Sequence, residues 1–116
     1  MQFIWYSKCS TCQSAKKFLD SHHFSYDNRS IVEDVPTISE IKNWISKYSI
    51  DLKKLFNTSG MKYRELHLKE KLPFMTDDEK IALLASDGML MKRPILVSSD
   101  FILVGFSDKE YKKKLQ

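Results

Sequence analysis

The chain has 116 residues, of which 42% are hydrophobic and 29% are charged. This length fits one folded domain and excludes two independent cores, and the composition is that of a soluble globular protein. No segment approaches the ~20 apolar residues of a membrane-spanning helix, and residues 1–7 lack the pattern of a signal peptide. We therefore expect a cytoplasmic protein that does not associate with membranes.

The formal net charge is +4, and much of the excess lies in four lysines near the C-terminus, at positions 109, 112, 113 and 114. A solvated helix end accounts for them, because cations are favourable near the C-terminus of a helix. A basic surface that binds a partner protein remains an alternative. Direct DNA binding is not expected, since the basic residues are not interleaved with aromatic residues as in a single-strand binder.

The first thirty residues predict a strand, a helix and a second strand. Phe3–Tyr6 is a short apolar run that indicates a buried strand, and helical spacing of apolar residues follows from Thr11 to about His22–His23. Phe24–Arg29 is the next expected strand, with Phe24 and Tyr26 on one side. A helical crossover between two strands favours parallel pairing in a βαβ unit.

The middle of the chain, about residues 36–90, is predicted to be entirely helical. Thr37 or Ser39 can cap a helix whose apolar positions run to Tyr48, and Thr76 begins another helix with acidic residues in its first turn. Short helices are expected at residues 51–56 and 63–68. Four aromatic residues of this region are interpreted as core: Trp44, Tyr48, Phe56 and Phe74.

The C-terminal part predicts a hairpin and a final helix. Ile95–Val97 and Phe101–Val104 are runs of β-forming residues joined by a polar turn at residues 98–100. Ser107 can cap a last helix whose apolar face carries Tyr111 and Leu115. The whole chain therefore predicts a single α/β domain, residues 1–116, with a βαβ half, a helical insert at about 36–90 and a ββα half.

Cys9 and Cys12 are the only cysteines, and they form a Cys-x-x-Cys motif between the first strand and helix. A secreted disulfide scaffold would carry more cysteines, so the pair indicates redox chemistry. The N-terminus of a helix favours a thiolate, and a second thiol one turn on can resolve a mixed disulfide. We predict Cys9 as the nucleophile and Cys12 as the resolving thiol. Lys8, Ser10 and Thr11 are expected to stabilise the Cys9 thiolate or a bound oxyanion.

Two other interpretations of the cysteine pair fit the sequence less well. Buried, inert structural cysteines are disfavoured by the polar turn around the motif. A zinc site needs two more ligands, and His22 would lie about 15 Å from Cys12 along the same helix, while His67 is single. We therefore expect no metal and no bound cofactor, and an external thiol reductant instead.

Arg93 precedes Pro94 just before the predicted hairpin. In a thioredoxin-like arrangement this dipeptide lies beside the redox motif, where a proline is commonly cis. Arg93 would then direct a permanent cation at the sulfurs and stabilise the Cys9 thiolate or an anionic substrate. The sequence fits an alternative as well, a proline at a strand edge with an arginine that faces solvent.

Over nearly its whole length the chain resembles the arsenate reductase (ArsC)/Spx family. The resemblance rests on five segments: residues 8–12 (KCSTC), 55–60 (LFNTSG), 63–66 (YREL), 93–97 (RPILV) and 104–106 (VGF). It implies a thioredoxin-like fold with a helical insert. The segments are most similar to the uncharacterised, arsenate-reductase-related and Spx-like branch of the family.

The resemblance implies a thiol–disulfide oxidoreductase that is reduced by glutathione and glutaredoxin or by thioredoxin. Two alternatives follow from the same family: a redox-sensing transcriptional regulator that binds RNA polymerase, as Spx does, and a glutaredoxin-dependent arsenate reductase. Arsenate reductases of this type hold the oxyanion with three arginines. Arg93 matches one of them, whereas Asn57 and Phe106 stand where the other two are expected.

Overall fold

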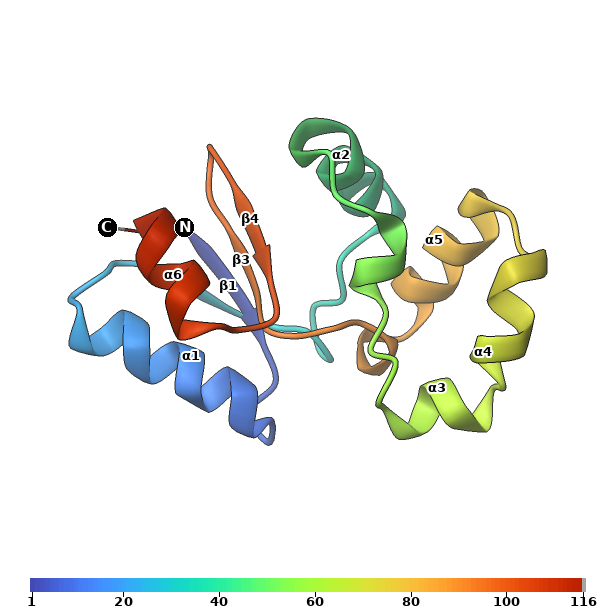
Figure 1. Ribbon diagram of the computed structural model, residues 1–116, viewed down its shortest axis with the longest axis horizontal. Coiled ribbons are helices and arrows are strands. Elements are labelled where there is room, and N and C mark those ends of the chain that lie inside the picture. The colour runs from blue at the N-terminus through green and yellow to red at the C-terminus, as the bar shows by residue number, and fades with distance from the viewer. Residues whose placement is uncertain (116) are drawn as a thin grey trace. The chain divides into compact units, whose positions relative to one another are not determined.

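The computed structural model describes residues 1–115, which group into two compact units (Figure 1). The sheet unit consists of Met1–Ile31 together with the chain from Arg93 onward, and the helical unit is Val32–Lys92. The helical unit corresponds to the predicted insert, while the expectation of one domain stays a prediction. No helix within residues 1–115 is long and apolar enough to cross a membrane.

The sheet unit contains a four-stranded sheet with the order β2-β1-β3-β4. Its strands are β1 (Gln2–Trp5), β2 (Asp27–Ser30), β3 (Ile95–Val97) and β4 (Ile102–Val104). β1 pairs with β2 in parallel, and the pairs β1–β3 and β3–β4 are antiparallel. The predicted parallel βαβ unit and the predicted C-terminal hairpin are both confirmed.

Two helices, α1 (Ser10–Ser21) and α6 (Asp108–Leu115), pack on one face of this sheet. Strand register brings three apolar side chains of neighbouring strands side by side on that face, because Phe3 pairs with Leu96 and Leu96 pairs with Leu103. Burial of each large side chain contributes roughly 1.5–3 kcal/mol. The buried core cluster consists of Phe3, Ala15, Phe18, Leu19, Leu96, Leu103 and Tyr111.

The second strand begins later than the sequence predicts. The backbone N–H of Phe24 donates to the carbonyl of Leu19 at 3.0 Å, so this residue belongs to the turn that follows α1. β2 starts only at Asp27, whose N–H donates to the carbonyl of Met1 at 2.9 Å. Phe24 and Tyr26 nevertheless pack against the core cluster, so their common orientation is confirmed although they lie outside the strand.

The helical unit is built from short helices with strong N-terminal caps. Its α-helices are α2 (Ile38–Tyr48), α3 (Met61–Glu65), α4 (Leu68–Lys71) and α5 (Asp77–Ser86). Its 3-10 turns are η1 (Leu52–Leu55), η2 (Leu72–Phe74) and η3 (Gly88–Leu90). Thr37 caps α2 and Thr76 caps α5, each in a capping box with the glutamate three residues on. The caps suggested by the sequence are thus confirmed at both threonines.

The interpretation of Phe74 as a core residue is wrong, because its side chain is 89% exposed. Phe74 is the last residue of η2, a single 3-10 turn that begins after Lys71 and contains Pro73. So short a turn has no continuous apolar face that could carry each of its side chains inward. The aromatic side chains of Trp44 and Phe56, by contrast, are 4% and 2% exposed, as expected.

Removal of the α5 cap should destabilise the protein. The Thr76 hydroxyl accepts a hydrogen bond of 3.1 Å from the Glu79 N–H, which otherwise has no partner within the helix. We expect Thr76→Ala to lower the free energy of unfolding by about 1 kcal/mol, as measured by urea denaturation. Thr58→Ala, at an exposed threonine that caps no helix, is the matched control. Equal stability of the two variants would contradict the expectation.

Candidate functional site

Cys9 occupies the N-cap position of α1. After β1 the chain turns, so that the Cys9 N–H donates to the carbonyl of Tyr6 at 3.1 Å and the Cys9 carbonyl accepts from Gln13 at the same distance. The extended backbone of Cys9 directs its Sγ back over the helix end, where it accepts a hydrogen bond from the Cys12 N–H at 3.4 Å. A half-buried sulfur at this place faces the positive end of the helix dipole and is suited to carrying negative charge.

Cys12 lies in the first turn of α1, on its buried face, and is 0% exposed. Burial raises the pKa of the Cys12 thiol to about 12, and the neighbouring Cys9 acts in the same direction. A backbone hydrogen bond from Tyr6 and the charge of Arg93 act the other way. The two sulfurs of the motif therefore have different environments, and Cys12 keeps its proton at neutral pH.

Arg93 and Pro94 immediately precede β3 in the chain. The Arg93–Pro94 peptide bond is cis, and the buried Pro94 is held by its carbonyl, which accepts from the Gly105 N–H at 2.8 Å. The guanidinium carbon of Arg93 lies 5.4 Å from the centre of the Tyr6 ring, in a cation–π arrangement. From there its charge acts on Cys12. The action of the Arg93 charge on Cys12 agrees with the first of the two interpretations that the sequence left open, and the role of Arg93 at the site stays a prediction.

The other residues expected at the site, Lys8, Ser10 and Thr11, are all exposed. They flank the half-buried Cys9 in the chain, and their role in stabilising its thiolate stays a prediction. The structure thus brings Cys9 and Cys12 together, with the charge of Arg93 acting on Cys12, and leaves the side chains of Lys8, Ser10 and Thr11 exposed.

Sequence reasoning missed three residues of the site. Tyr6 supplies both a backbone donor for Cys12 and a ring for Arg93, but was interpreted only as strand core. The Gln13 side chain donates to the Ser7 carbonyl at 2.8 Å and braces the turn before Cys9. Tyr111 was expected only as an apolar helix residue, although a negative charge on Cys12 acts on its hydroxyl. The available signal was the residue type at position 111, because a tyrosine on an apolar helix face buries a hydroxyl that a phenylalanine lacks.

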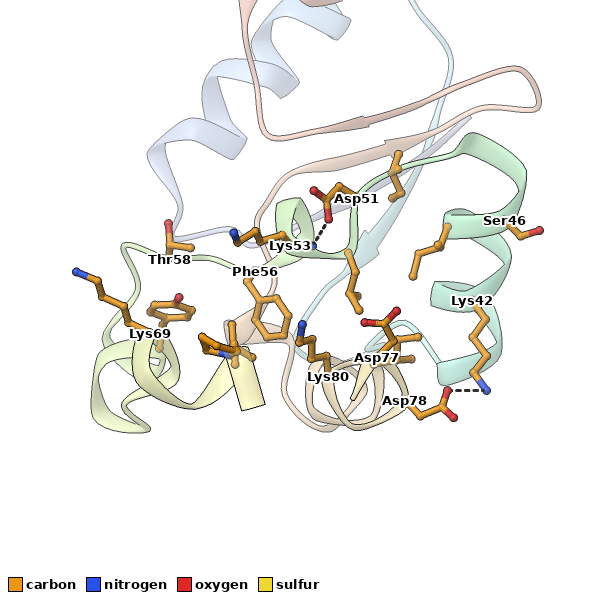
Figure 2. Close-up of a pocket in the computed structure, with 17 residues that line it drawn as sticks. Lys42, Ser46, Asp51, Lys53, Phe56, Thr58, Lys69, Asp77, Asp78 and Lys80 are labelled. Carbon is orange, nitrogen blue, oxygen red and sulfur yellow. Dashed lines mark hydrogen bonds and ion pairs between the residues drawn. The ribbon is translucent and has the colours of Figure 1, made fainter. Parts of the chain in front are cut away.

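The helical unit contains a pocket of about 920 Å³. Figure 2 shows the ring of Phe56 in this pocket, with Lys53, Lys69 and Lys80 around it and Lys42 in an ion pair of 3.6 Å with Asp78. Apolar side chains such as Phe56 and Ile81 line the pocket together with positively charged lysines and negatively charged aspartates. No cysteine or histidine lines the pocket, so it is suited to binding rather than to thiol chemistry.

The three histidines considered as metal ligands lie at element ends. The ring of His22, which caps α1, stacks on Phe18 at 4.1 Å, and its Nδ1 lies 2.8 Å from the Phe18 carbonyl oxygen. His23 and His67 have left-handed backbone conformations at turns. Within the described part of the chain, no three His, Cys, Asp or Glu side chains come together in a group that could hold a metal ion.

Comparison with known proteins places this chain among a defined group of relatives. The family model described as the ArsC family matches residues 4–114. The uncharacterised protein YusI of Bacillus subtilis is 49% identical over 113 residues, which cover 97% of this chain and 96% of YusI. The crystal structure of an ArsC-family-related protein from Bacteroides fragilis has a TM-score of 0.91 and 52% identity, covering 97% of this chain and 94% of that one.

A more distant relative is named as a regulator. The global transcriptional regulator Spx 2 of Bacillus cereus is 22% identical over 109 residues, which cover 94% of this chain and 82% of the regulator. The similarity to solved structures of ArsC-like proteins shows that the chain has their thioredoxin-like fold, as predicted from the sequence.

The different environments of the two thiols predict selective alkylation. A pKa raised from 9.0 to about 12 lowers the thiolate fraction of Cys12 at neutral pH about a thousandfold, and burial blocks the reagent as well. We expect iodoacetamide to label Cys9 and to leave Cys12 unmodified, as measured by peptide mass spectrometry. Labelling of Cys12 should rise only as the pH approaches 12 or after unfolding. Labelling of Cys12 before Cys9 would contradict this assignment.

Proposed function

This chain belongs to the ArsC family, and we propose that it is a cytoplasmic thiol–disulfide redox protein in which Cys9 is the nucleophile and Cys12 the resolving thiol. One observation carries the proposal: the Cys9 Sγ accepts a hydrogen bond from the Cys12 N–H at the N-terminus of α1, with the buried Cys12 thiol directly behind it. An accessible sulfur at a helix N-terminus next to a second, protected sulfur suits a two-step thiol exchange.

In the first step the Cys9 thiolate attacks one sulfur of an oxidised substrate, R–S–S–R′. The substrate S–S bond breaks, R′–S⁻ leaves, and a mixed disulfide Cys9–S–S–R forms. In the second step the Cys12 sulfur attacks the Cys9 sulfur, its proton passes to the departing R–S⁻, and a Cys9–Cys12 disulfide forms. Two electrons have then moved to the substrate, and two thiols of an external reductant return them.

The surroundings of the pair support this order of events. Cys12 keeps its proton while Cys9 reacts, so the two thiols do not compete for the substrate. The Arg93 cation and the Tyr6 backbone lower the cost of deprotonating Cys12 in the second step. Lys8, Ser10 and Thr11 offer a cation and hydroxyl groups at the entrance to Cys9, where a substrate such as a glutathione disulfide would bind.

Variants of the two cysteines should separate the two steps. We expect Cys9→Ser to abolish reduction of hydroxyethyl disulfide by glutathione, because no nucleophile remains. Cys12→Ser should still complete the first step and accumulate a mixed disulfide between Cys9 and glutathione, detectable as an added mass in intact-protein mass spectrometry. Circular dichroism checks that both variants are folded. Turnover by Cys9→Ser at the wild-type rate would refute the proposal.

An authentic arsenate reductase is less well supported by the same residues. Asn57 and Phe106 occupy the positions where the resemblance to arsenate reductases expects arginines. The Phe106 ring is packed on Tyr111, with 4.7 Å between ring centres, so it holds no anion. Arg93 is then the remaining arginine of the expected three, and binding of a small oxyanion depends on several such charge-assisted hydrogen bonds.

A redox-controlled regulator is the second candidate function, favoured by the similarity to the Spx 2 regulator. In this role the Cys9–Cys12 disulfide changes the affinity for a partner protein, for which the resemblance to Spx suggests RNA polymerase. The pocket of the helical unit supports binding of a protein segment, because its apolar floor around Phe56 is rimmed by charged side chains such as Lys69 (Figure 2).

Purified bacterial RNA polymerase tests this second function. If the chain is such a regulator, its binding to the polymerase, measured by biolayer interferometry, should differ at least severalfold between the reduced and disulfide forms. Lys69→Glu, at the rim of the pocket, should weaken binding, whereas Lys47→Glu, at an exposed lysine outside the lining, should not. Absence of binding in both redox forms would leave the oxidoreductase as the function.

A further inference from the structure

The hydroxyl of Tyr111 has no role in the packing of the sheet unit. Tyr111 is 0% exposed, and its Oη has no hydrogen-bond partner among the described residues. Buried polar groups are normally paired, because a hydroxyl removed from water without a partner destabilises the folded state. A phenylalanine would fill the same space without this cost. An unpaired hydroxyl at such a place indicates a function for the oxygen itself.

The ring of Tyr111 is held in one orientation by its neighbours. It packs edge-on against Phe106 at 4.7 Å and against Phe18 at 5.6 Å between ring centres. Phe18 belongs to the buried face of α1, which begins with Cys12 and continues through Ala15. Helix α6 lies beside α1 in Figure 1, and Tyr111 of α6 packs on Phe18, which shares its face of α1 with the resolving thiol.

The Tyr111 ring packs on Phe18, on the face of α1 that carries Cys12, and the charge of Cys12 acts on the Tyr111 hydroxyl. Burial is the main cause of the raised pKa of Tyr111, and the negative charge of a Cys12 thiolate raises it further, with a smaller effect of Glu110. Tyr111 therefore keeps its proton at every pH at which the protein works. Toward a sulfur on this helix face it can act only as a neutral hydrogen-bond donor, and it has no other partner among the described residues.

Building on the function proposed above, we propose that Tyr111 is a further catalytic residue, whose buried hydroxyl donates a hydrogen bond to the Cys12 sulfur as that sulfur attacks the mixed disulfide. The hydroxyl transfers no proton: the Cys12 proton still goes to the departing thiolate, the Cys9–S–R bond breaks and the Cys9–Cys12 bond forms. Charge-assisted hydrogen bonds of this kind are about twice as strong as neutral ones, and they strengthen as the thiolate develops. Tyr111 thus lowers the barrier of the second step alone.

Reaction with dithiobis(nitrobenzoate) resolves the two steps. Attack by Cys9 releases a first equivalent of the coloured nitrothiobenzoate, and attack by Cys12 on the resulting mixed disulfide releases a second. In Tyr111→Phe we expect the first phase to be unchanged and the second to be slower by roughly tenfold or more, the loss typical of a hydrogen bond to a charged group. The pH profile of the second phase should also move to higher pH.

Stability measurements and a matched tyrosine separate this effect from a structural one. Tyr111→Phe should unfold at the same temperature as the wild type or higher, because it loses only an unpaired hydroxyl. Tyr26→Phe is the control: its hydroxyl lies in the same unit, donates to Asp20 and accepts from Lys16, so its loss should leave the second phase unchanged.

The outcomes distinguish this inference from the proposed function. Release of two equivalents by the wild type, with an unchanged second phase in Tyr111→Phe, would overturn the role of Tyr111 and leave the redox function intact. A lowered unfolding temperature of Tyr111→Phe would likewise overturn it, since the hydroxyl would then be structural. Release of only one equivalent by the wild type would refute the function itself, because Cys12 would not resolve the mixed disulfide.

Discussion

The buried face of α1 carries Cys12, Ala15, Phe18 and Leu19, and burial of this face against the sheet determines where both sulfurs lie. The helix begins at Ser10, so Cys9 is the last residue before the helical turns and remains at the rim of the core. Cys12 is one turn further and is carried inward with the apolar residues that follow it. The difference between the two thiols is therefore a consequence of core packing.

The different burial of the two thiols suits them to different steps of the reaction. A sulfur at the helix N-terminus can meet a substrate, whereas a sulfur with a pKa of about 12 stays protonated until a mixed disulfide forms beside it. The cost of later removing that proton is reduced by one group near in the chain and one far from it. The Tyr6 backbone and the Arg93 charge act on the Cys12 sulfur in this way, and the buried Tyr111 hydroxyl joins them in the mechanism proposed above.

The same pair can serve an oxidoreductase or a redox-controlled regulator, because both need a disulfide that forms and opens reversibly. The residues of the site distinguish between substrates better than they distinguish an oxidoreductase from a regulator. The resemblance to arsenate reductases expects three arginines around the oxyanion, and this sequence matches only Arg93 of them, with Asn57 and Phe106 at the other two positions. A disulfide substrate needs no such cluster of cations, and its leaving thiolate carries only one charge.

The amino-acid sequence by itself determined the features that depend on near neighbours. The caps at Thr37 and Thr76, the hairpin from Ile95 to Val104 and the position of Cys9 at a helix N-terminus all follow from side chains within a few residues of one another. The family resemblance added the thioredoxin-like fold, because its motifs extend over most of the chain.

Only the tertiary structure decided the environments that distant segments create together. The exposure of Phe74, the late start of β2 and the unpaired hydroxyl of Tyr111 were not predictable from local patterns, and the sequence left two interpretations of Arg93 open. Periodicity shows which face of an element is apolar, but not which side chain of another element will lie against it. That partner is selected when the chain packs, and the packing sets burial, charge proximity and hence the reactivity of the two cysteines.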